Sequence, residues 1–216
     1  MTQEDPVFTE IAEAVITGNA EKITALVQQA LAGGASVHDI LEQGLIAGMN
    51  EVGQRFRDYE MFVPEVLLSA KAMQAGLNLL KPLLTGSGAP GRGKVVIGTV
   101  EGDIHDIGKN LVISFLEGAG FEVIDLGTDV SPHRFVEAIR RENPQILGMS
   151  SLLTSTLPAM HKTIEALIEA GIRHQVKVLV GGAPVTQSYA DSIGADGYAP
   201  DGASGAIKAR QLVGRP

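Results

Sequence analysis

The chain of 216 residues contains no cysteine and no tryptophan, and aromatic residues make up only 4% of it. The lack of cysteine excludes disulfides, zinc–thiolate sites, cysteine-ligated iron–sulfur clusters and thiol nucleophiles. Because aromatic residues are scarce, we expect a core built mainly from Ala, Val, Ile and Leu. The hydrophobic content of 44% is ordinary for a globular protein with such a core.

Basic clusters and long apolar runs are also missing. The net charge is −8 and no block of Lys or Arg is present, which argues against nucleic acid or an anionic membrane as a partner. No apolar run approaches the roughly 18 residues of a membrane span. No basic-plus-apolar segment of the kind found in secretory signals begins the sequence. We therefore expect a soluble, cytoplasmic protein.

A glycine-rich segment separates two halves of different character. Thr85–Gly93 contains four glycines and one proline among nine residues, a composition typical of linkers. We predict a first domain over residues 1–85, a linker over 86–93 and a second domain over 94–216.

The first half has helical periodicity and no good strand candidate. Apolar residues recur at spacings that line one face of a helix. The expected helices are Pro6–Thr17, Ala20–Leu31, Ser36–Arg57 and Pro64–Leu84. The first domain is therefore predicted to be an all-α helical bundle.

The second half alternates between strand and helix patterns. Strand candidates are Lys94–Val100, Glu122–Leu126, Gln145–Ser150, Lys177–Val180 and Gly197–Tyr198. Helices are expected at Gly108–Ala119, Pro132–Glu142, Pro158–Ala170, Thr186–Ile193 and Ala203–Leu212. This alternation predicts an α/β domain with a flavodoxin-like, doubly wound parallel sheet. Such sheets bind ligands at the carboxyl ends of their strands.

One imidazole lies on the loop that leaves the first predicted strand. The sequence there is Asp103-Ile104-His105-Asp106-Ile107-Gly108. A histidine with an acid two residues away is suited to bind a metal while the carboxylate holds its other ring nitrogen. From these residues alone, a helix-capping cluster or a divalent-metal site remains an alternative.

Small residues follow the next strands at the same predicted edge. Hydroxyl side chains are dense after the third strand, and Gly181-Gly182 follows the fourth strand, where a ligand can approach the backbone closely. Taken singly, such residues are typical of turns and helix caps. Together with His105 they predict a deep slot with an imidazole at its mouth.

These motifs resemble a known signature. Asp103-x-His105-x-x-Gly108, Ser150-x-Leu152 and Gly181-Gly182 are similar to the B12-binding signature of cobalamin-dependent methyltransferases and mutases. Upstream, Gly48–Gly53 and Met61–Val66 resemble the helical cap that precedes the B12 domain of methionine synthase. In size and organisation, nearly the whole chain resembles the small corrinoid proteins of methanol, methylamine and methoxy-compound methyltransferase systems.

The resemblance implies cobalamin as the cofactor, in its methylcobalamin or Co(I) form. It assigns His105 as the lower axial cobalt ligand in place of the cofactor's own dimethylbenzimidazole, with Asp103 and Thr156 as a relay to that ligand. Methionine synthase carries serine where this chain has Thr156, and the hydroxyl is kept. The implied cofactor-binding set is Asp103, His105, Asp106, Ile107, Gly108, Ser150, Leu152, Thr154, Thr156, Gly181 and Gly182. The residues implied to cover the corrin are Phe56, Val63 and Val66.

The implied function is a corrinoid carrier that is not catalytic alone. It would move a methyl group from a substrate-specific methyltransferase to a second methyltransferase acting on a pterin or thiol acceptor, and a reductive activase is a further partner that the resemblance allows. The sequence contains no barrel of about 250 residues to bind either substrate. The methyl donor and acceptor are left open.

The sequence also allows other functions. A B12- or light-sensing regulatory module is the main alternative, although it would need a DNA-binding part with a basic helix. The small subunit of a mutase and an ordinary receiver module are less well matched. A receiver would want an aspartate at the end of the third strand, where this chain has Ser150.

Overall fold

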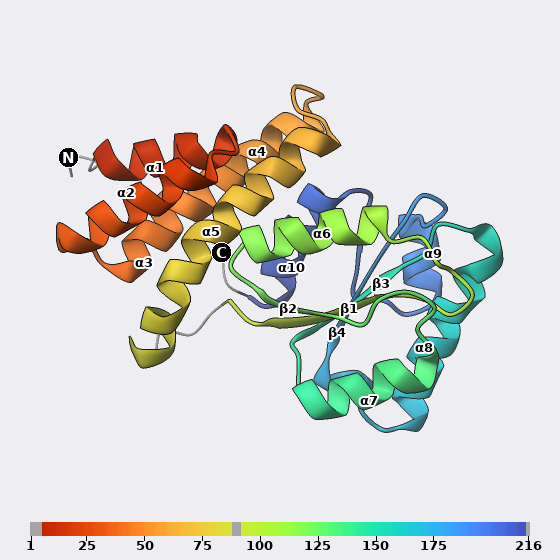
Figure 1. Ribbon diagram of the computed structural model, residues 1–216. Coiled ribbons are helices and arrows are strands. Elements are labelled where there is room, and N and C mark those ends of the chain that lie inside the picture. The colour runs from red at the N-terminus through yellow and green to blue at the C-terminus, as the bar shows by residue number, and fades with distance from the viewer. Residues whose placement is uncertain (1–5, 88–91, 215–216) are drawn as a thin grey trace. The chain divides into compact units, whose positions relative to one another are not determined.

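The computed structural model describes residues 6–87 and 92–214 (Figure 1). The chain divides into two compact units between Pro90 and Gly91, with Glu117–Gly120 grouped with the first unit.

The first unit is entirely helical, as predicted. Its elements are α1 (Pro6–Ile16), α2 (Ala20–Ala32), α3 (Val37–Asp39), the π-helix η1 (Ile40–Ile46), α4 (Ala47–Arg57) and α5 (Val63–Ser87). Helix α1 packs against α2 and α4, and α2 packs against α5. The single helix expected over Ser36–Arg57 is continuous but changes to π geometry in its middle.

Small residues allow α1 to approach closely in this bundle. A Cβ added at Gly44 would lie 2.8 Å from Ile11, and one added at Gly48 would lie 2.7 Å from the Ala12 carbonyl oxygen. Both glycines are buried, so a larger side chain at either position would separate the helices. The contact explains two glycines that are otherwise unfavourable inside helices.

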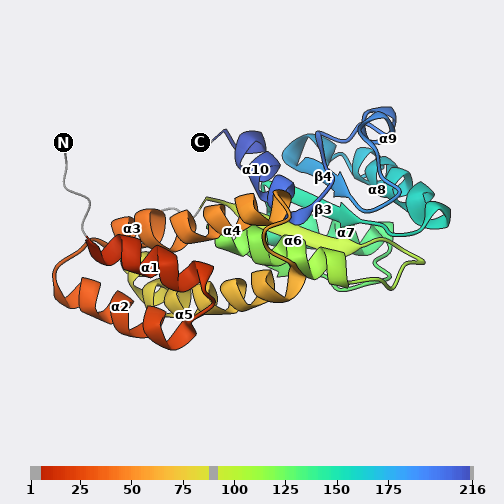
Figure 2. The same ribbon diagram turned by 90° about the horizontal axis from the view of Figure 1, so that it is seen from above.

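The second unit is a five-stranded parallel sheet with helices on both faces. Its strands are β1 (Lys94–Thr99), β2 (Glu122–Asp125), β3 (Ile146–Ser150), β4 (Lys177–Gly181) and β5 (Gly197–Ala199), in the order β2-β1-β3-β4-β5. The helices are α6 (Ile107–Gly118), α7 (Pro132–Glu142), α8 (Leu157–Glu169), α9 (Gln187–Ser192) and α10 (Gly202–Leu212). Short 3₁₀ helices occur at η2 (Thr154–Thr156) and η3 (Arg173–Gln175). Helices α6 and α10 cover one face of the sheet, and α7 and α8 cover the other (Figures 1 and 2).

Local sequence explains where these helices begin. Ser131, Thr186 and Asp201 accept backbone hydrogen bonds as N-caps of α7, α9 and α10. Strands β1 and β3 are short aliphatic runs buried on both faces, as expected for the centre of a parallel sheet between two helical layers, whereas the edge strand β2 is not fully buried. The flavodoxin-like fold class is therefore confirmed.

An ion pair between a buried lysine and a partly exposed aspartate ties α6 to the sheet. Lys109 is only 2% exposed, and its ammonium lies 2.6 Å from Asp125 Oδ2 and 2.9 Å from Asn110 Oδ1. An unpaired buried ammonium would be strongly destabilising, so Asp125 at the end of β2 fixes the first turn of α6. This pairing was not predicted, because sequence spacing does not reveal which acid meets a buried lysine.

The glycine-rich segment is partly helical. Helix α5 continues to Ser87, two residues into the predicted linker, and residues 88–91 lie outside the described part of the chain. The predicted domain limits stay predictions. Within residues 6–87 and 92–214, no helix combines the length and the apolar character that crossing a membrane requires.

Candidate functional site

The strand register brings the predicted site loops together. Thr99 of β1 pairs with Ser150 of β3, and Ser150 pairs with Gly181 of β4, so three strands end side by side. From β1 the chain crosses to β2 on one side, whereas from β3 it crosses to β4 on the other. The loops after β1 and β3 therefore flank the switch in strand order, where open α/β sheets place their ligand sites.

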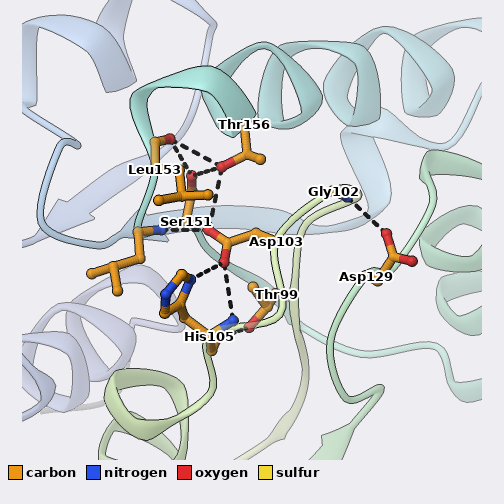
Figure 3. Close-up of polar contacts among 9 residues, drawn as sticks. Thr99, Gly102, Asp103, His105, Asp129, Ser151, Leu153 and Thr156 are labelled. Atoms are coloured by element: carbon orange, nitrogen blue, oxygen red, sulfur yellow. Dashed lines mark hydrogen bonds and ion pairs between the residues drawn. The ribbon is translucent and has the colours of Figure 1, made fainter.

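His105 is held by Asp103 at this edge (Figure 3). The His105 Nδ1 atom lies 2.7 Å from Asp103 Oδ1, and the His105 backbone N–H donates to the same oxygen at 3.0 Å. The imidazole is 46% exposed and the carboxylate is fully buried. Because an ionised carboxylate can only accept, Nδ1 carries the proton, and the lone pair of Nε2 is available to a metal.

Asp103 receives hydrogen bonds on both oxygens. Its Oδ2 accepts from the Leu152 backbone N–H at 2.6 Å and from the Thr156 hydroxyl at 3.2 Å. Burial acts to raise the pKa of Asp103, but the four hydrogen bonds from His105, Leu152 and Thr156 outweigh it and lower the pKa to about 2. The group is therefore an anion at neutral pH.

A second hydroxyl extends this network. The Ser151 hydroxyl lies 2.8 Å from the Thr156 hydroxyl, and both residues are buried. Thr156 is a predicted site residue, but the hydroxyl that contacts it belongs to Ser151 rather than to Ser150 or Thr154. Among the described residues, no hydrogen bond joins Ser150 or Thr154 to this network, and the Thr154 side chain is exposed.

The loop that carries Asp103 is fastened from two neighbouring segments. The Thr99 hydroxyl donates to the His105 carbonyl oxygen at 2.8 Å, and Asp129 Oδ1 accepts from the Gly102 backbone N–H at 2.7 Å. The Asp129 backbone N–H donates to the Asp103 carbonyl oxygen at 2.9 Å. Asp129 adopts a left-handed φ of 53°, which aspartate tolerates better than most residues. Asp129 was not predicted as a site residue, because it follows a different strand, 24 residues after His105.

The predicted small residues have distinct structural reasons. A Cβ added at Gly182 would lie 1.8 Å from the Ser151 carbonyl oxygen, so Gly182 is required for packing. Nothing lies within 4 Å of a Cβ added at Gly108, and packing alone does not explain that glycine. Helix α6 begins at Ile107, one residue earlier than predicted. Asp106 directly precedes it, and the Asp106 backbone carbonyl oxygen accepts from the Asn110 backbone N–H at 2.8 Å.

Exposed apolar side chains flank the imidazole. Ile104 and Ile107 are 77% and 75% exposed, and Leu152 and Leu153 from the neighbouring loop are 44% and 39% exposed. Exposed aliphatic groups beside one polar ligand suit a large ligand with an apolar face. Within the described residues, no group of three or more His, Asp or Glu side chains could hold a bare metal ion. A metal bound here by His105 would have to bring its other ligands with it.

The predicted cap residues differ in exposure. Val66 is fully buried, and Phe56 and Val63 are partly buried. Tyr59 and Phe62, in the turn between α4 and α5, are 84% and 62% exposed and were not among the predicted cap residues. The proposed cover over a corrin stays a prediction.

Comparison with known proteins identifies the family. Two family models described as B12 binding domains match residues 93–207 and residues 7–81. Dimethylamine corrinoid protein 1 of Methanosarcina acetivorans is 46% identical over 214 residues, which cover 99% of this chain and 100% of that protein. The chain belongs to the B12-binding corrinoid proteins. Its cofactor is cobalamin or a related corrinoid.

Solved structures of the same fold agree with this assignment. A cobalamin-binding protein from Desulfitobacterium hafniense has a TM-score of 0.81 and 33% identity, covering 95% of this chain and 98% of that one. One chain of the methanol:cobalamin methyltransferase complex of Methanosarcina barkeri has a TM-score of 0.84 and 31% identity, and the match covers 98% of this chain and 81% of that one. The residues fit such a cofactor: among the described residues no three His, Asp or Glu side chains gather to hold a bare ion, and His105 would be the protein's ligand to a metal that brings its other ligands with it.

Proposed function

We propose that this chain is a corrinoid carrier that binds cobalamin through His105 with the cofactor's own nucleotide base detached from cobalt. The observation that carries the proposal is the geometry of the imidazole: Nδ1 is held by the buried carboxylate of Asp103, and the ring, whose opposite nitrogen keeps its lone pair, is 46% exposed. A single fixed lone pair in such surroundings suits one axial position of a flat cofactor.

Different residues of the site would have different roles in binding the cofactor. His105 supplies the ligand, while Asp103 fixes the ring orientation and the tautomer. Ile104, Ile107 and Leu152 offer the apolar surface for the macrocycle. The detached nucleotide tail would run past Gly108, where nothing lies within 4 Å of an added Cβ, towards Ser150. The bound corrinoid supplies the cobalt that accepts and releases the methyl group.

We further propose that the carrier serves two methyltransferases. Relatives named dimethylamine and trimethylamine corrinoid proteins match 99% of this chain, which supports a methylated amine as the methyl donor. A methyltransferase for that amine would load the corrinoid, and a second enzyme would pass the methyl group to a pterin or thiol acceptor. The carrier would not be catalytic without these partners.

The first test is the ultraviolet–visible spectrum of the protein loaded with hydroxocobalamin and desalted. We expect the wild-type protein to retain the corrin and to show a histidine-ligated spectrum. His105→Ala removes the imidazole lone pair and leaves the exposed apolar side chains Ile104, Ile107 and Leu152 in place. Any corrinoid that this variant retains should therefore have a different spectrum. A wild-type protein that retains no corrinoid, or an unchanged spectrum in His105→Ala, would contradict the proposal.

Methyl transfer is tested on the loaded wild-type protein. Methylation of the reduced corrinoid is expected with dimethylamine or trimethylamine and the matching methyltransferase. Methylation only with methanol and its methyltransferase would overturn the amine assignment while leaving the carrier role intact.

Gly108→Ala separates cofactor binding from folding. Nothing lies within 4 Å of the new methyl group, and Gly108 is in the first turn of α6, so stability should stay equal or rise by about 0.5–1 kcal/mol. If the nucleotide tail passes here, the methyl group should weaken cobalamin binding about tenfold. Equilibrium dialysis and thermal unfolding measure the two effects.

Gly205→Ala is the matched control for this substitution. Gly205 lies inside α10, where the nearest atoms to an added Cβ are ordinary contacts at 3.6 and 3.8 Å. We expect unchanged cobalamin affinity in this variant. Equal affinities in both variants would mean that the nucleotide tail does not pass Gly108.

A further inference from the structure

Ser151 is a buried hydroxyl to which the proposed function gives no role. Its side chain is fully buried directly after β3, and its backbone N–H donates to the Gly181 carbonyl oxygen at 3.2 Å. The hydroxyl oxygen lies 2.8 Å from Thr156 Oγ1 and 3.1 Å from the Leu153 carbonyl oxygen. Figure 3 shows Thr156 between Ser151 and Asp103, so the three groups form a chain that ends on His105.

The number of hydroxyl protons decides which group donates to which in this series of hydrogen bonds. Ser151 and Thr156 bring one hydroxyl proton each, and two oxygens 2.8 Å apart require a proton between them. Asp103 accepts only, so the Thr156 proton is best placed on it, at 3.2 Å. The Leu153 carbonyl oxygen, 3.0 Å from the Thr156 hydroxyl, already accepts the Thr156 backbone N–H at 3.2 Å. The Ser151 hydroxyl also lies 3.1 Å from that carbonyl oxygen, but with the Thr156 proton on the Asp103 anion the short contact between the two hydroxyls holds a proton only if Ser151 donates to Thr156.

We propose that Ser151 is a positioning residue that donates to Thr156 and so keeps the Thr156 proton directed at Asp103. This inference rests on the proposed function, because it concerns the residue pair that would orient the cobalt ligand. Hydrogen bonds in such a chain polarise one another, so the Ser151 donor strengthens the bond from Thr156 to Asp103.

The direction of the effect on the axial ligand follows. A strong donor on Asp103 Oδ2 draws negative charge away from Oδ1, the oxygen that accepts from His105. The imidazole is then a weaker electron donor towards a metal than it would be beside an unshared carboxylate. Removing Ser151 should therefore make His105 a tighter axial ligand, and removing the Thr156 hydroxyl should do so more strongly.

The test is a set of four proteins: wild type, Ser151→Ala, Thr156→Val and the double variant. Each is loaded with cob(II)alamin and reduced with titanium(III) citrate in a spectroelectrochemical cell, because one-electron reduction of cobalt releases the axial ligand. We expect Ser151→Ala to tighten the ligand about twofold and Thr156→Val about tenfold. At 59 mV per tenfold change, these shifts lower the midpoint potential by about 18 and about 59 mV.

The double variant decides whether Ser151 acts through Thr156. If it does, Ser151→Ala changes nothing further once the Thr156 hydroxyl is gone, so the double variant matches Thr156→Val. An additional shift in the double variant, or no shift in Ser151→Ala alone, overturns the inference. Thr156→Ser keeps the hydroxyl and should retain both the wild-type potential and the response to Ser151→Ala, which covers a Thr156→Val protein that does not fold.

Failure of the inference can be told apart from failure of the proposed function. If the proposed function is wrong, the electron paramagnetic resonance spectrum of the cob(II)alamin-loaded wild-type protein lacks the nitrogen superhyperfine splitting from His105. Failure of the inference leaves that splitting in place and removes only the difference between wild type and Ser151→Ala.

Discussion

Replacing Gly182 with alanine should lower the free energy of unfolding by more than about 3 kcal/mol. The new methyl group would lie 1.8 Å from the Ser151 carbonyl oxygen and 2.8 Å from its carbonyl carbon. These are backbone atoms, so no side-chain rotation relieves the overlap, and the loop after β3 or the loop after β4 must move. Gly182 also has a φ of 129°, which L-residues rarely adopt. Urea unfolding followed by circular dichroism measures the loss.

Gly194→Ala separates the backbone strain from the overlap. Gly194 also has a positive φ, 75°, but nothing lies within 4 Å of an added Cβ. We expect this control to lose only the roughly 1–2 kcal/mol that a left-handed conformation costs a residue with a side chain. Equal losses in the two variants would mean that the contact between Gly182 and Ser151 does not determine stability.

Asp103→Asn should lower stability by about 3 kcal/mol and change the spectrum of bound cobalamin. Each carboxylate oxygen accepts one fixed backbone N–H, from His105 at 3.0 Å or from Leu152 at 2.6 Å. Either orientation of the asparagine amide places its NH₂ group against one of these donors, and a buried donor without an acceptor costs about 1–3 kcal/mol. The ion that fixes the His105 tautomer is lost as well. Thermal unfolding and the cobalamin spectrum report the two effects.

Asp201→Asn is the control for this substitution. Asp201 accepts from the Ser204 backbone N–H and from its hydroxyl, which can rotate, and asparagine is an equally good N-cap. We expect a change below about 0.5 kcal/mol. A similar loss of stability in both variants would mean that the two fixed backbone donors on Asp103 do not explain the effect of Asp103→Asn.

The dependence of stability on pH should also differ in the Asp103→Asn protein. The pKa of Asp103 is about 2 in the folded chain against an ordinary value of 3.8, so the folded state favours the anion. Its contribution to stability is present above about pH 4 and is lost as the pH falls towards 2. The slope of stability against pH in this window should therefore be smaller in Asp103→Asn than in wild type.

The fold class and most element boundaries could be predicted from local sequence patterns. Helical and strand periodicity are local properties, because each depends on which side chains share a face within a few turns or residues. The expected strand Lys94–Val100 is β1 with one residue fewer, and the expected helix Pro132–Glu142 matches α7 at both ends. The contact between His105 and Asp103 could also be predicted from the sequence, because two residues in one short loop remain neighbours in almost any fold.

The tertiary structure alone decided the rest of the site. Ser151 and Ser150 are adjacent hydroxyls in the sequence, and only the close approach of Gly182 and Gly181 places Ser151 inside. Asp129 reaches Gly102 because β1 and β2 are neighbours in the sheet, and no local pattern encodes that adjacency. Lys109 meets Asp125 for the same reason. Hydrogen bonds form between groups that the packing of strands brings within about 3 Å, and that packing is a property of the whole sheet rather than of any segment.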